Sequence, residues 1–368
     1  MSILSEALPK QSLTPLQQAA VERIELFTRE MAKKGIYVRS AMELEFTIMD
    51  EKGEPLQLAL KPERIKEAER YLQQKIPHHI QRFGYECVNP ETGVIRSDIK
   101  YEVNVIDNEN GVSSHYNPLA VAEVTAKLKD KTLAEMLSET TCLNSPYPCF
   151  PNFAAHPYPN PHPTTYDERE HNKQSAGLHV NVSLYDAKGH NLFAESLNLR
   201  DQCLKSMLEI QRDALLMMMP KQNSLSRVGL GKSGINLAVP VEIKLGYEKG
   251  QISTALRDHD SKDAVRIENR LPGADADPYV AMAVTMAALY ETTQKHVHHT
   301  AAENRQALDN GQHFVDHEQT IDFARYDIPD TYPGVIERFR RATRLKTLLG
   351  EKLYSAVIDS AEREGAAR

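Results

Sequence analysis

The chain has 368 residues, with 44 lysines and arginines against 51 aspartates and glutamates and a net charge of −7. This acidic balance argues against a dedicated nucleic-acid binder, and a hydrophobic fraction of 41% excludes a disordered chain. The longest nearly apolar stretch, residues 280–289, is too short to span a membrane, which takes about 20 residues. The N-terminus carries no export signal and the four cysteines show no CxxC spacing. We therefore expect a reduced, cytoplasmic protein.

The first half of the chain predicts alternating helices and strands. Residues 14–34 form the first expected helix, with Thr14 as its cap, Pro15 in its first position and Gln17 completing a capping box. A strand over 36–50, a charged amphipathic helix over 61–75, a strand over 101–106 and a helix over 118–137 follow. Residues 145–165 contain seven of the chain's 20 prolines, which predicts a loop without regular secondary structure.

The second half predicts a strand over 178–185, a turn over 186–189 and a mostly helical segment over 191–219. A strand over 265–271 and a helix over 278–295 come next, and the tail over 333–364 forms two helical stretches separated near Gly350. The strands lack a βαβ rhythm, and no linker marks a domain boundary. The chain therefore predicts an α+β fold with an antiparallel sheet.

The sequence AMELEF places two carboxylates on one face of a strand. Because side chains alternate along a strand, Glu43 and Glu45 point one way while Met42, Leu44 and Phe46 point into a core. Two interpretations are open: a strand with one solvated face, or a pair of carboxylates that holds divalent cations.

The same alternation recurs on three more strands. The polar faces comprise His179, Asn181 and Ser183; Arg266, Glu268 and Arg270; and Glu102 with Asn104, followed by Glu109. A sheet with one solvated face would also alternate, but it would more often use Thr, Lys and Ser. Five carboxylates and a histidine indicate a hard cation, Mg²⁺ or Mn²⁺, and the arginines indicate a phosphate or carboxylate anion beside it.

These motifs resemble, in order, the catalytic domain of glutamine synthetases. They are ELEF, YEV followed by NE, SAGLHVNVSL, NSLSRV and RIENRLPGADADPYVAMAVTMAAL. The last is the most specific, because the family carries Arg-x-Glu-x-Arg-x-Pro followed by an Asn-Pro-Tyr helix start, read here as Asp277-Pro278-Tyr279. The resemblance spans nearly the whole chain. It implies an α+β fold with a curved antiparallel sheet flanked by helices, and a single catalytic domain over residues 1–368.

The resemblance also implies roles for individual residues. Glu45, Glu102 and Glu109 would hold the metal beside the amino-acid substrate, and Glu43, His179 and Glu268 the metal at the nucleotide phosphates. Gly177, Arg227 and Arg270 would bind the glutamate-like acid. Ser183, Asn181, Arg257 and Arg266 would lie at the nucleotide, and Arg227, Arg257 and Glu268 would act in catalysis.

The implied reaction is a two-step ligation that uses ATP and Mg²⁺ or Mn²⁺. A carboxylate, most simply that of glutamate, takes the γ-phosphoryl group of ATP, and an amine then displaces phosphate. The implied partners are small molecules, not nucleic acid or a membrane. A homo-oligomer is compatible with the resemblance, but it need not be the family's double ring.

Several features depart from the family pattern. The small N-terminal β-grasp domain, which serves the ammonium site, has no counterpart before the helix at Thr14, so we expect an amine other than, or as well as, ammonia. Glu102 and Glu109 are seven residues apart, one fewer than in the family, which leaves Asn110 as the alternative ligand position. Asn181 stands for the family's second histidine and Ile252 for an arginine. Glu242 and Glu248 are the candidates to replace the glutamate of the family's flap.

Two other functions stay open: a non-catalytic relative that binds nucleotide or glutamate and regulates a partner, and a phosphotransferase of related fold. The GLGKS sequence lacks the first glycine of a phosphate-binding loop, because Ser226 stands there. His296, His298 and His299 close a helix, where cationic side chains are favoured, and the basic run over 338–346 is typical of a solvated helix face.

Overall fold

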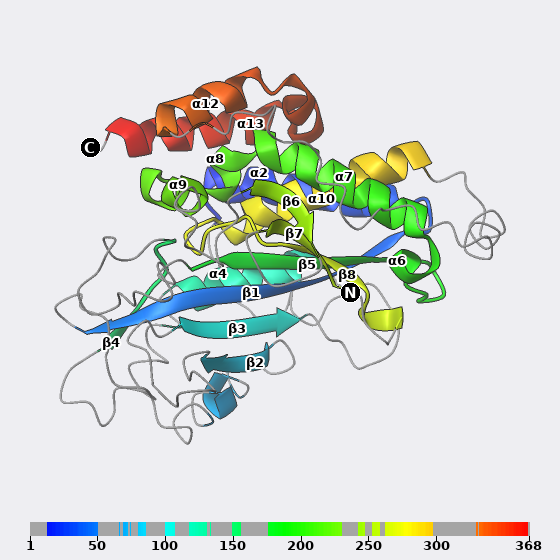
Figure 1. Ribbon diagram of the computed structural model, residues 1–368, viewed down its shortest axis with the longest axis horizontal. Helices are drawn as coiled ribbons and strands as arrows, with labels where there is room; N and C mark the ends of the chain where they lie inside the picture. The colour runs from blue at the N-terminus through cyan, green and yellow to red at the C-terminus, as the bar shows by residue number, and fades with distance from the viewer. Residues whose placement is uncertain are drawn as a thin grey trace.

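The computed structural model describes residues 13–50, 66, 69–72, 74, 80–85, 100–106, 118–130, 133, 149–155, 176–229, 242–246, 252–257, 262–296, 329 and 331–366. Over these residues the chain forms an open, twisted sheet with a layer of helices packed on it (Figure 1). None of the described helices is long and apolar enough to cross a membrane.

The sheet has eight strands among the described residues. Their order is β2 (Ile80–Tyr85), β3 (Lys100–Ile106), β1 (Tyr37–Asp50), β5 (Leu178–Tyr185), β8 (Arg266–Asn269), β7 (Ile252–Arg257) and β6 (Glu242–Gly246), while β4 (Cys149–Asn152) pairs with the end of β1. The pairings are antiparallel except for β6 with β7, which is parallel. The predicted α+β class is confirmed, with one parallel pair added.

The described α-helices are α2 (Pro15–Ala32), α4 (Pro118–Lys129), α6 (Leu192–Glu195), α7 (Leu197–Asp213), α8 (Leu215–Met218), α9 (Gln222–Gly229), α10 (Pro278–His296), α12 (Tyr332–Arg341) and α13 (Thr343–Ala366). Of these, α4 and α10 pack on the face of the sheet opposite the polar side chains, while α12 and α13 pack on other helices. The central helix is α10, which is buried from Pro278 to Leu289 and packs against α2, α4, α7 and α13. A helix that is apolar on all sides is stable only in such a position.

The first helix follows from its sequence. The Thr14 hydroxyl accepts a hydrogen bond from the Gln17 backbone nitrogen at 3.2 Å. The side-chain Oε1 atom of Gln17 accepts from the Thr14 backbone nitrogen at 3.1 Å, so the predicted capping box is present. Ile24, Phe27 and Met31 are fully buried, as their helical spacing predicted. The side-chain Nε2 atom of Gln17 also donates to the Asp277 carboxylate at 2.9 Å, and this aspartate caps α10. The start of α2 is thereby tied to the start of the central helix.

Strand β1 shows the predicted alternation. Met42, Leu44 and Phe46 are fully buried, and they face the helical layer. Glu43 and Glu45 therefore point to the other face. The apolar half of the strand fixes which face each carboxylate occupies, because a shift by one residue would bury the charged side chains in the core.

The proline-rich segment is not wholly irregular, contrary to the prediction for residues 145–165. Residues 149–152 form β4, in which Pro151 lies opposite Ile48. Proline is tolerated in a short edge strand, where its missing N–H can face away from the partner. Strands β2, β6 and β7 were not predicted. The expected helix over 61–75 is described only at residues 66, 69–72 and 74, which are helical, and the expected turn at 51–53 lies outside the described residues.

The C-terminal helical segment is interrupted at the predicted position, Gly350, and at a second position that was not predicted. Gly350 has φ 72° and ψ 159° inside α13, and a further break at Ala342 separates α12 from α13. A Cβ atom at Gly350 would approach the Arg23 guanidinium to 2.6 Å. The Arg23 guanidinium in turn donates to the Leu348 carbonyl at 2.7 Å, so this glycine allows α2 and α13 to meet.

Gly350→Ala should lower the free energy of unfolding by about 1–3 kcal/mol, because only glycine adopts this backbone conformation without strain. Chemical denaturation measures the loss. The control is Gln294→Ala, an exposed helical position, where we expect a change within about 0.5 kcal/mol. Equal effects of the two substitutions would contradict this role of Gly350.

An ion-pair cluster joins three helices. Arg344 of α13 contacts Glu209 of α7 at 2.6 Å and Glu291 of α10 at 2.9 Å. Burial raises the pKa of Glu291, but hydrogen bonds from Arg344 and Lys295 outweigh it and lower this pKa to about 2. A carboxyl whose pKa falls on folding stabilises the protein above its unfolded pKa, and this contribution is lost as the pH drops through the folded value.

Arg344→Met should therefore destabilise the protein at pH 7 by about 1–2 kcal/mol, since part of the cluster is solvent-screened. The deficit should shrink as the pH falls from about 4.5 toward 2, which urea denaturation at several pH values would follow. The matched control is Arg341→Met, whose partner Glu337 lies on the same exposed helix face, and it should cost under about 0.5 kcal/mol. A deficit independent of pH would contradict the assignment to Glu291.

Candidate active site

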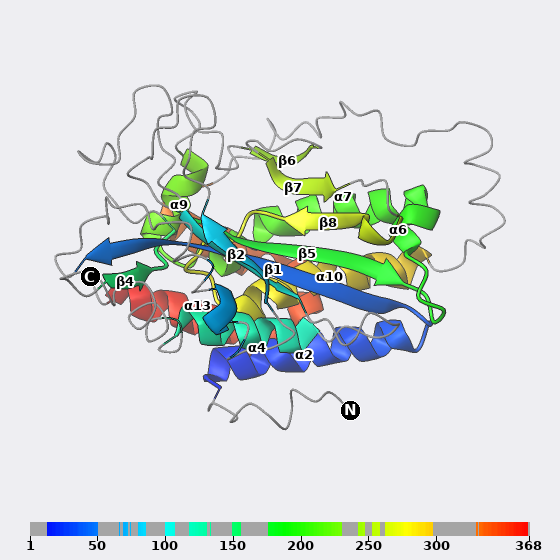
Figure 2. The same ribbon diagram turned by 90° about the horizontal axis from the view of Figure 1, so that it is seen from below.

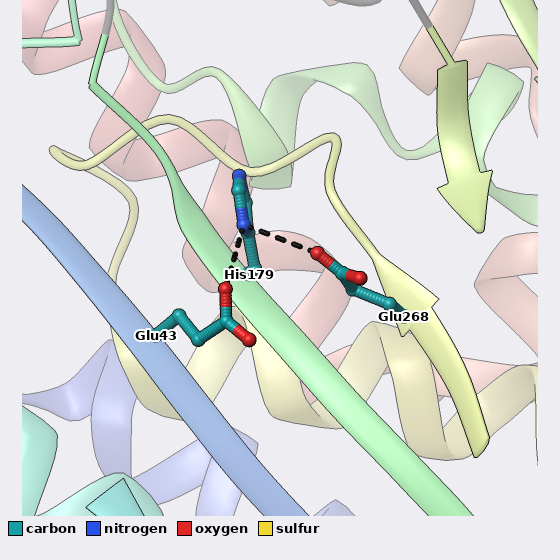
Figure 3. Close-up of side chains that lie close together, drawn as sticks. All are labelled: Glu43, His179 and Glu268. Atoms are coloured by element: carbon teal, nitrogen blue, oxygen red, sulfur yellow. Dashed lines mark hydrogen bonds and ion pairs between the residues drawn. The ribbon is translucent and has the colours of Figure 1, made fainter. Parts of the chain in front are cut away.

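Three adjacent strands bring two carboxylates and a histidine together. Strand β5 lies between β1 and β8 (Figure 2), with His179 opposite Glu43 on one side and Asn181 opposite Glu268 on the other. Because side chains two residues apart share a face, Glu43, His179 and Glu268 converge on the same side of the sheet. Figure 3 shows the imidazole of His179 between the two carboxylates.

The three side chains lie within reach of a single ion. The Nδ1 atom of His179 is 3.2 Å from Glu43 Oε2 and 3.3 Å from Glu268 Oε1. One ligand atom from each residue lies within 4.8 Å of the other two. Glu268 is 1% exposed, whereas the Glu43 side chain is 22% exposed, so solvent reaches the cluster from the side of Glu43.

The charges of this cluster favour a cation. Burial lowers the pKa of His179, but hydrogen bonds to Glu268 and Glu43 outweigh it and raise this pKa to about 9. The direction of this shift shows that the two neighbouring carboxylates favour positive charge between them. A divalent metal bound in place of the imidazole proton would likewise neutralise the two carboxylates. Two carboxylate oxygens and one imidazole nitrogen form a donor set that suits Mn²⁺ or Mg²⁺.

Polar side chains continue the site along β5. The Asn181 amide donates to Glu43 Oε1 at 3.1 Å, and its carbonyl oxygen accepts from Arg266 Nε at 2.9 Å. Ser183, the next residue on this face, donates to the Val265 carbonyl at 2.8 Å. Asn181 and Ser183 are both buried. Asn181 therefore connects Arg266 to Glu43, which places a positive charge on this side of the site.

At the other end of the site, Gly177 lies in a backbone bridge directly before β5. The Gly177 nitrogen donates to Glu45 Oε2 at 2.7 Å, and the Glu45 nitrogen donates to the Gly177 carbonyl at 2.9 Å. Gly177 also pairs with Gly273, whose nitrogen donates to the Met218 carbonyl at 2.9 Å. Glu45 is thus held two residues along β1 from Glu43. Gly273 was not singled out from the sequence, although the Pro-Gly pair after Arg270 is a signal that could have identified it.

Arg270 reaches the carboxylate cluster directly. Its Nε atom is 3.5 Å from Glu268 Oε1. It follows Glu268 by two residues, so both side chains lie on the same face of the strand and its continuation. Positive charge is thereby provided on two sides of the carboxylates, by Arg266 near Asn181 and by Arg270 near Glu268.

The remaining predicted residues are described only in part or not at all. Glu102 lies in β3 directly opposite Glu45, and Arg257 lies in β7 opposite Arg266, but their side chains are outside the described residues. Arg227 lies in α9, again without a described side chain. Glu109, Asn110 and Glu248 lie wholly outside the described residues, and Glu242 is described only as the first residue of β6.

Comparison with curated proteins gives two relatives. Gamma-glutamylputrescine synthetase PuuA of Escherichia coli (strain K12) is 22% identical over 279 residues, which are 71% of this chain and 52% of that protein. Gamma-glutamylethanolamide synthetase GlnA4 of Streptomyces coelicolor (strain ATCC BAA-471 / A3(2) / M145) is 28% identical over 193 residues, which are 52% of this chain and 37% of that protein. The chain thus spans about half the length of the first relative and less of the second.

Solved structures share the fold at low identity. The structure titled "Apo GmaS without ligand" matches with a TM-score of 0.63 and 18% identity, over 97% of this chain and 75% of that chain. A "novel glutamine synthase homolog" matches with a TM-score of 0.62 and 14% identity, over 95% and 71%. The predicted fold, a sheet flanked by helices as in glutamine synthetase catalytic domains, is confirmed.

The family model for "Glutamine synthetase, catalytic domain" matches residues 164–367. This match covers more than half of the chain and includes His179, Glu268 and Arg270, while Glu43 and Glu45 precede it. The resemblance drawn from the five motifs is therefore confirmed, and the chain belongs to the glutamine synthetase catalytic-domain family.

Proposed function

We propose that the chain carries the active site of an ATP-dependent carboxylate–amine ligase, which joins glutamate, through a γ-glutamyl phosphate, to an amine other than, or as well as, ammonia. The observation that carries the proposal is the Glu43–His179–Glu268 cluster with Arg270 beside it, in a chain of this family. A ligase of this type must neutralise the charge of a transferring phosphoryl group, and such a cluster is suited to that task.

The proposed metal sites use the carboxylates of β1 and its neighbours. Glu43, His179 and Glu268 would hold one divalent cation, and Glu45 with Glu102 and Glu109 would hold a second. A bound Mg²⁺ or Mn²⁺ neutralises charge on phosphoryl oxygens and so lowers the barrier to transfer. The cross-strand pairing of Glu45 with Glu102 supports the second site, because side chains directly opposite each other in an antiparallel pair are about 5 Å apart.

The order of side chains along β5 supports a division of the site. Gly177, His179, Asn181 and Ser183 alternate along the strand, with about 6.7 Å between each and the next. We assign the acid substrate to the Gly177 end, where Glu45 and Arg270 lie, and the nucleotide to the Ser183 end, where Arg266 lies. The metal ligands lie between them, where the γ-phosphoryl group would pass from nucleotide to acid.

The arginines supply fixed positive charge for the two anions. Arg270, beside Glu268, would bind a carboxylate of the acid, and Arg227 would bind it from α9. Arg266 would face the nucleotide together with Arg257, its register neighbour on β7. A guanidinium binds carboxylate and phosphate through two parallel hydrogen bonds, so these residues would orient both groups for in-line transfer.

The names of the relatives support an organic amine as second substrate. One relative is named for γ-glutamylputrescine and the other for γ-glutamylethanolamide, and both products join a glutamyl group to a primary amine. Since identity to each is low, the amine used by this chain can differ from both. An amine panel is therefore part of the test.

We expect Glu268→Gln to weaken Mn²⁺ binding at least tenfold, because the change removes a charged oxygen ligand from the buried side of the cluster and keeps its shape. Titration calorimetry of the folded protein with MnCl₂, in the absence of substrates, measures the affinity. Glu195→Gln, which removes an exposed carboxylate on α6, is the matched control and should leave it unchanged. Equal Mn²⁺ affinity in the parent and Glu268→Gln would exclude Glu268 as a ligand.

We expect ADP release from ATP to require glutamate, a divalent metal and an amine, and to be lost in Glu268→Gln. The assay uses glutamate with ammonia, putrescine, ethanolamine, methylamine and longer diamines, and mass spectrometry identifies the γ-glutamyl product. Amine-dependent ADP release with at least one organic amine supports the proposal.

Two results would contradict the proposed ligase. Tight binding of ATP or glutamate without turnover for any amine would indicate the regulatory alternative. Phosphorylated acid that accumulates in stoichiometric amount without phosphate release would indicate a phosphotransferase instead. Turnover with ammonia alone would contradict the organic-amine part only.

A further inference from the structure

A polar residue, Asn269, lies on the buried face of β8, where a core strand ordinarily carries apolar side chains. Asn269 stands between the site residues Glu268 and Arg270, and alternation turns its side chain toward the helical layer. The neighbours on that face, Ile267 and Leu271, are apolar and fully buried, and Asn269 is fully buried as well. Burial of an amide in an apolar layer is costly unless every polar atom is hydrogen-bonded.

The amide of Asn269 is bonded to three different parts of the chain. Its Nδ2 atom donates to Thr285 Oγ1 on α10 at 2.9 Å. Its Oδ1 atom accepts from Gln211 Nε2 on α7 at 2.6 Å and from the Leu271 backbone nitrogen at 3.2 Å. One side chain therefore links the central helix, a second helix and the end of its own strand.

The network continues through its partners. Gln211 Oε1 accepts from Thr254 Oγ1 on β7 at 3.0 Å, and Thr285 Oγ1 donates to the Ala281 carbonyl at 2.9 Å. Gln211, Thr254, Asn269 and Thr285 are all fully buried. We call these four side chains the Asn269 network. Hydrogen bonds are directional, so a buried network with its members bonded fixes a single arrangement of the elements it joins.

Strand β8 is short and carries the buried ligand candidate Glu268. It has four residues, of which three pair with β5 and all four pair with β7. The ion pairs of Glu268 with His179 and with Arg270 measure 3.3 and 3.5 Å, longer than the usual charge-assisted hydrogen bond of about 2.8 Å. Because β8 carries Glu268, a shift of the β8 backbone would move this carboxylate relative to His179 and Arg270. The bond from Leu271 to Asn269 also determines how the chain turns directly after Arg270.

We infer that Asn269 is a positioning residue that, through Gln211, Thr254 and Thr285, orients Glu268 and Arg270 for metal and anion binding on the opposite face of β8. The inference rests on the proposed metal site. The outer partners of metal ligands commonly change metal affinity by 10- to 100-fold when they are removed. Asn269 contributes in the same way through the backbone, although it touches neither metal nor substrate.

The test measures Mn²⁺ affinity by calorimetry in folded protein without substrates, so it needs no turnover. Asn269→Leu keeps the approximate size and removes every side-chain hydrogen bond of the residue. Thr292→Val is the control, since Thr292 is buried on the same helix as Thr285 but bonds to the Ala288 and Gln202 carbonyls and not to β8. We expect at least tenfold weaker Mn²⁺ binding for Asn269→Leu and unchanged binding for Thr292→Val.

A second variant covers the case in which Asn269→Leu does not fold. The combined variant Gln211→Leu, Thr254→Val, Asn269→Leu and Thr285→Val replaces all four side chains of the network by apolar groups. No network side chain then keeps a donor whose acceptor was removed, and among the described donors only the Leu271 N–H loses its bond to Asn269 Oδ1, so the change can be nearly neutral for stability. We expect this folded variant to bind Mn²⁺ at least tenfold more weakly too. A purely structural network would change thermal stability and leave the affinity of the folded protein as in the parent, and that result would overturn the inference.

The outcome is separate from that of the proposed ligase activity. A parent protein that binds Mn²⁺ but releases no ADP with any amine contradicts the ligase and leaves the effect of Asn269 on metal affinity intact. A parent with full ligase activity whose network variants bind Mn²⁺ normally contradicts the positioning role alone. In an active parent, we also expect the variants to show a raised half-saturating Mn²⁺ concentration, with turnover recovered in part at high Mn²⁺.

Discussion

The close approach of two carboxylates to one imidazole nitrogen is the constraint on which the rest of the site depends. Glu43 and Glu268 come from strands on either side of β5 and both lie within 3.3 Å of His179 Nδ1. Like charges held this close are unfavourable unless a cation lies between them, as the raised pKa of His179 reflects. The protein tolerates the arrangement because the opposite face of the same strands is buried apolar surface, from Met42 and Leu44 to Val180 and Ile267. Hydrophobic burial holds the strands in place, and the strands hold the charges together.

The helical layer does more than cover the sheet. Helix α10 packs on α2, α4 and α7 and begins at Pro278, directly after its cap Asp277 and shortly after Gly273, which pairs with Gly177. The same segment thus shapes the Gly177 end of the site on one face and the central helix on the other. Asn269 gives a second connection, since its bonds to Gln211 and Thr285 attach β8 to α7 and α10. Changes in the packing of these helices should therefore be felt at Glu268 and Arg270.

Patterns within single segments of the sequence predicted which face of a strand each side chain occupies and where the first helix begins. Alternation in AMELEF and LHVNVSL gave the correct faces for Glu43 and His179, and the Thr14–Gln17 capping box gave the start of α2. Long-range pairing decided the rest. Strands β6 and β7 are short and their pairing is not encoded in their own residues, while β4 forms around Pro151 because β1 offers it an edge. The role of Asn269 was invisible from the sequence, because its partners Gln211 and Thr285 are 58 and 16 residues away along the chain.

The central claim is that Glu43, His179 and Glu268 together bind a divalent metal. A crystal grown with MnCl₂ and measured at the manganese absorption edge tests it most directly, because the anomalous signal locates the ion without reference to any assumed ligand. The account predicts an anomalous peak between the three side chains, within coordination distance of one oxygen from each carboxylate and of His179 Nδ1. Manganese bound elsewhere in the chain, with no anomalous peak between these three side chains, would contradict it.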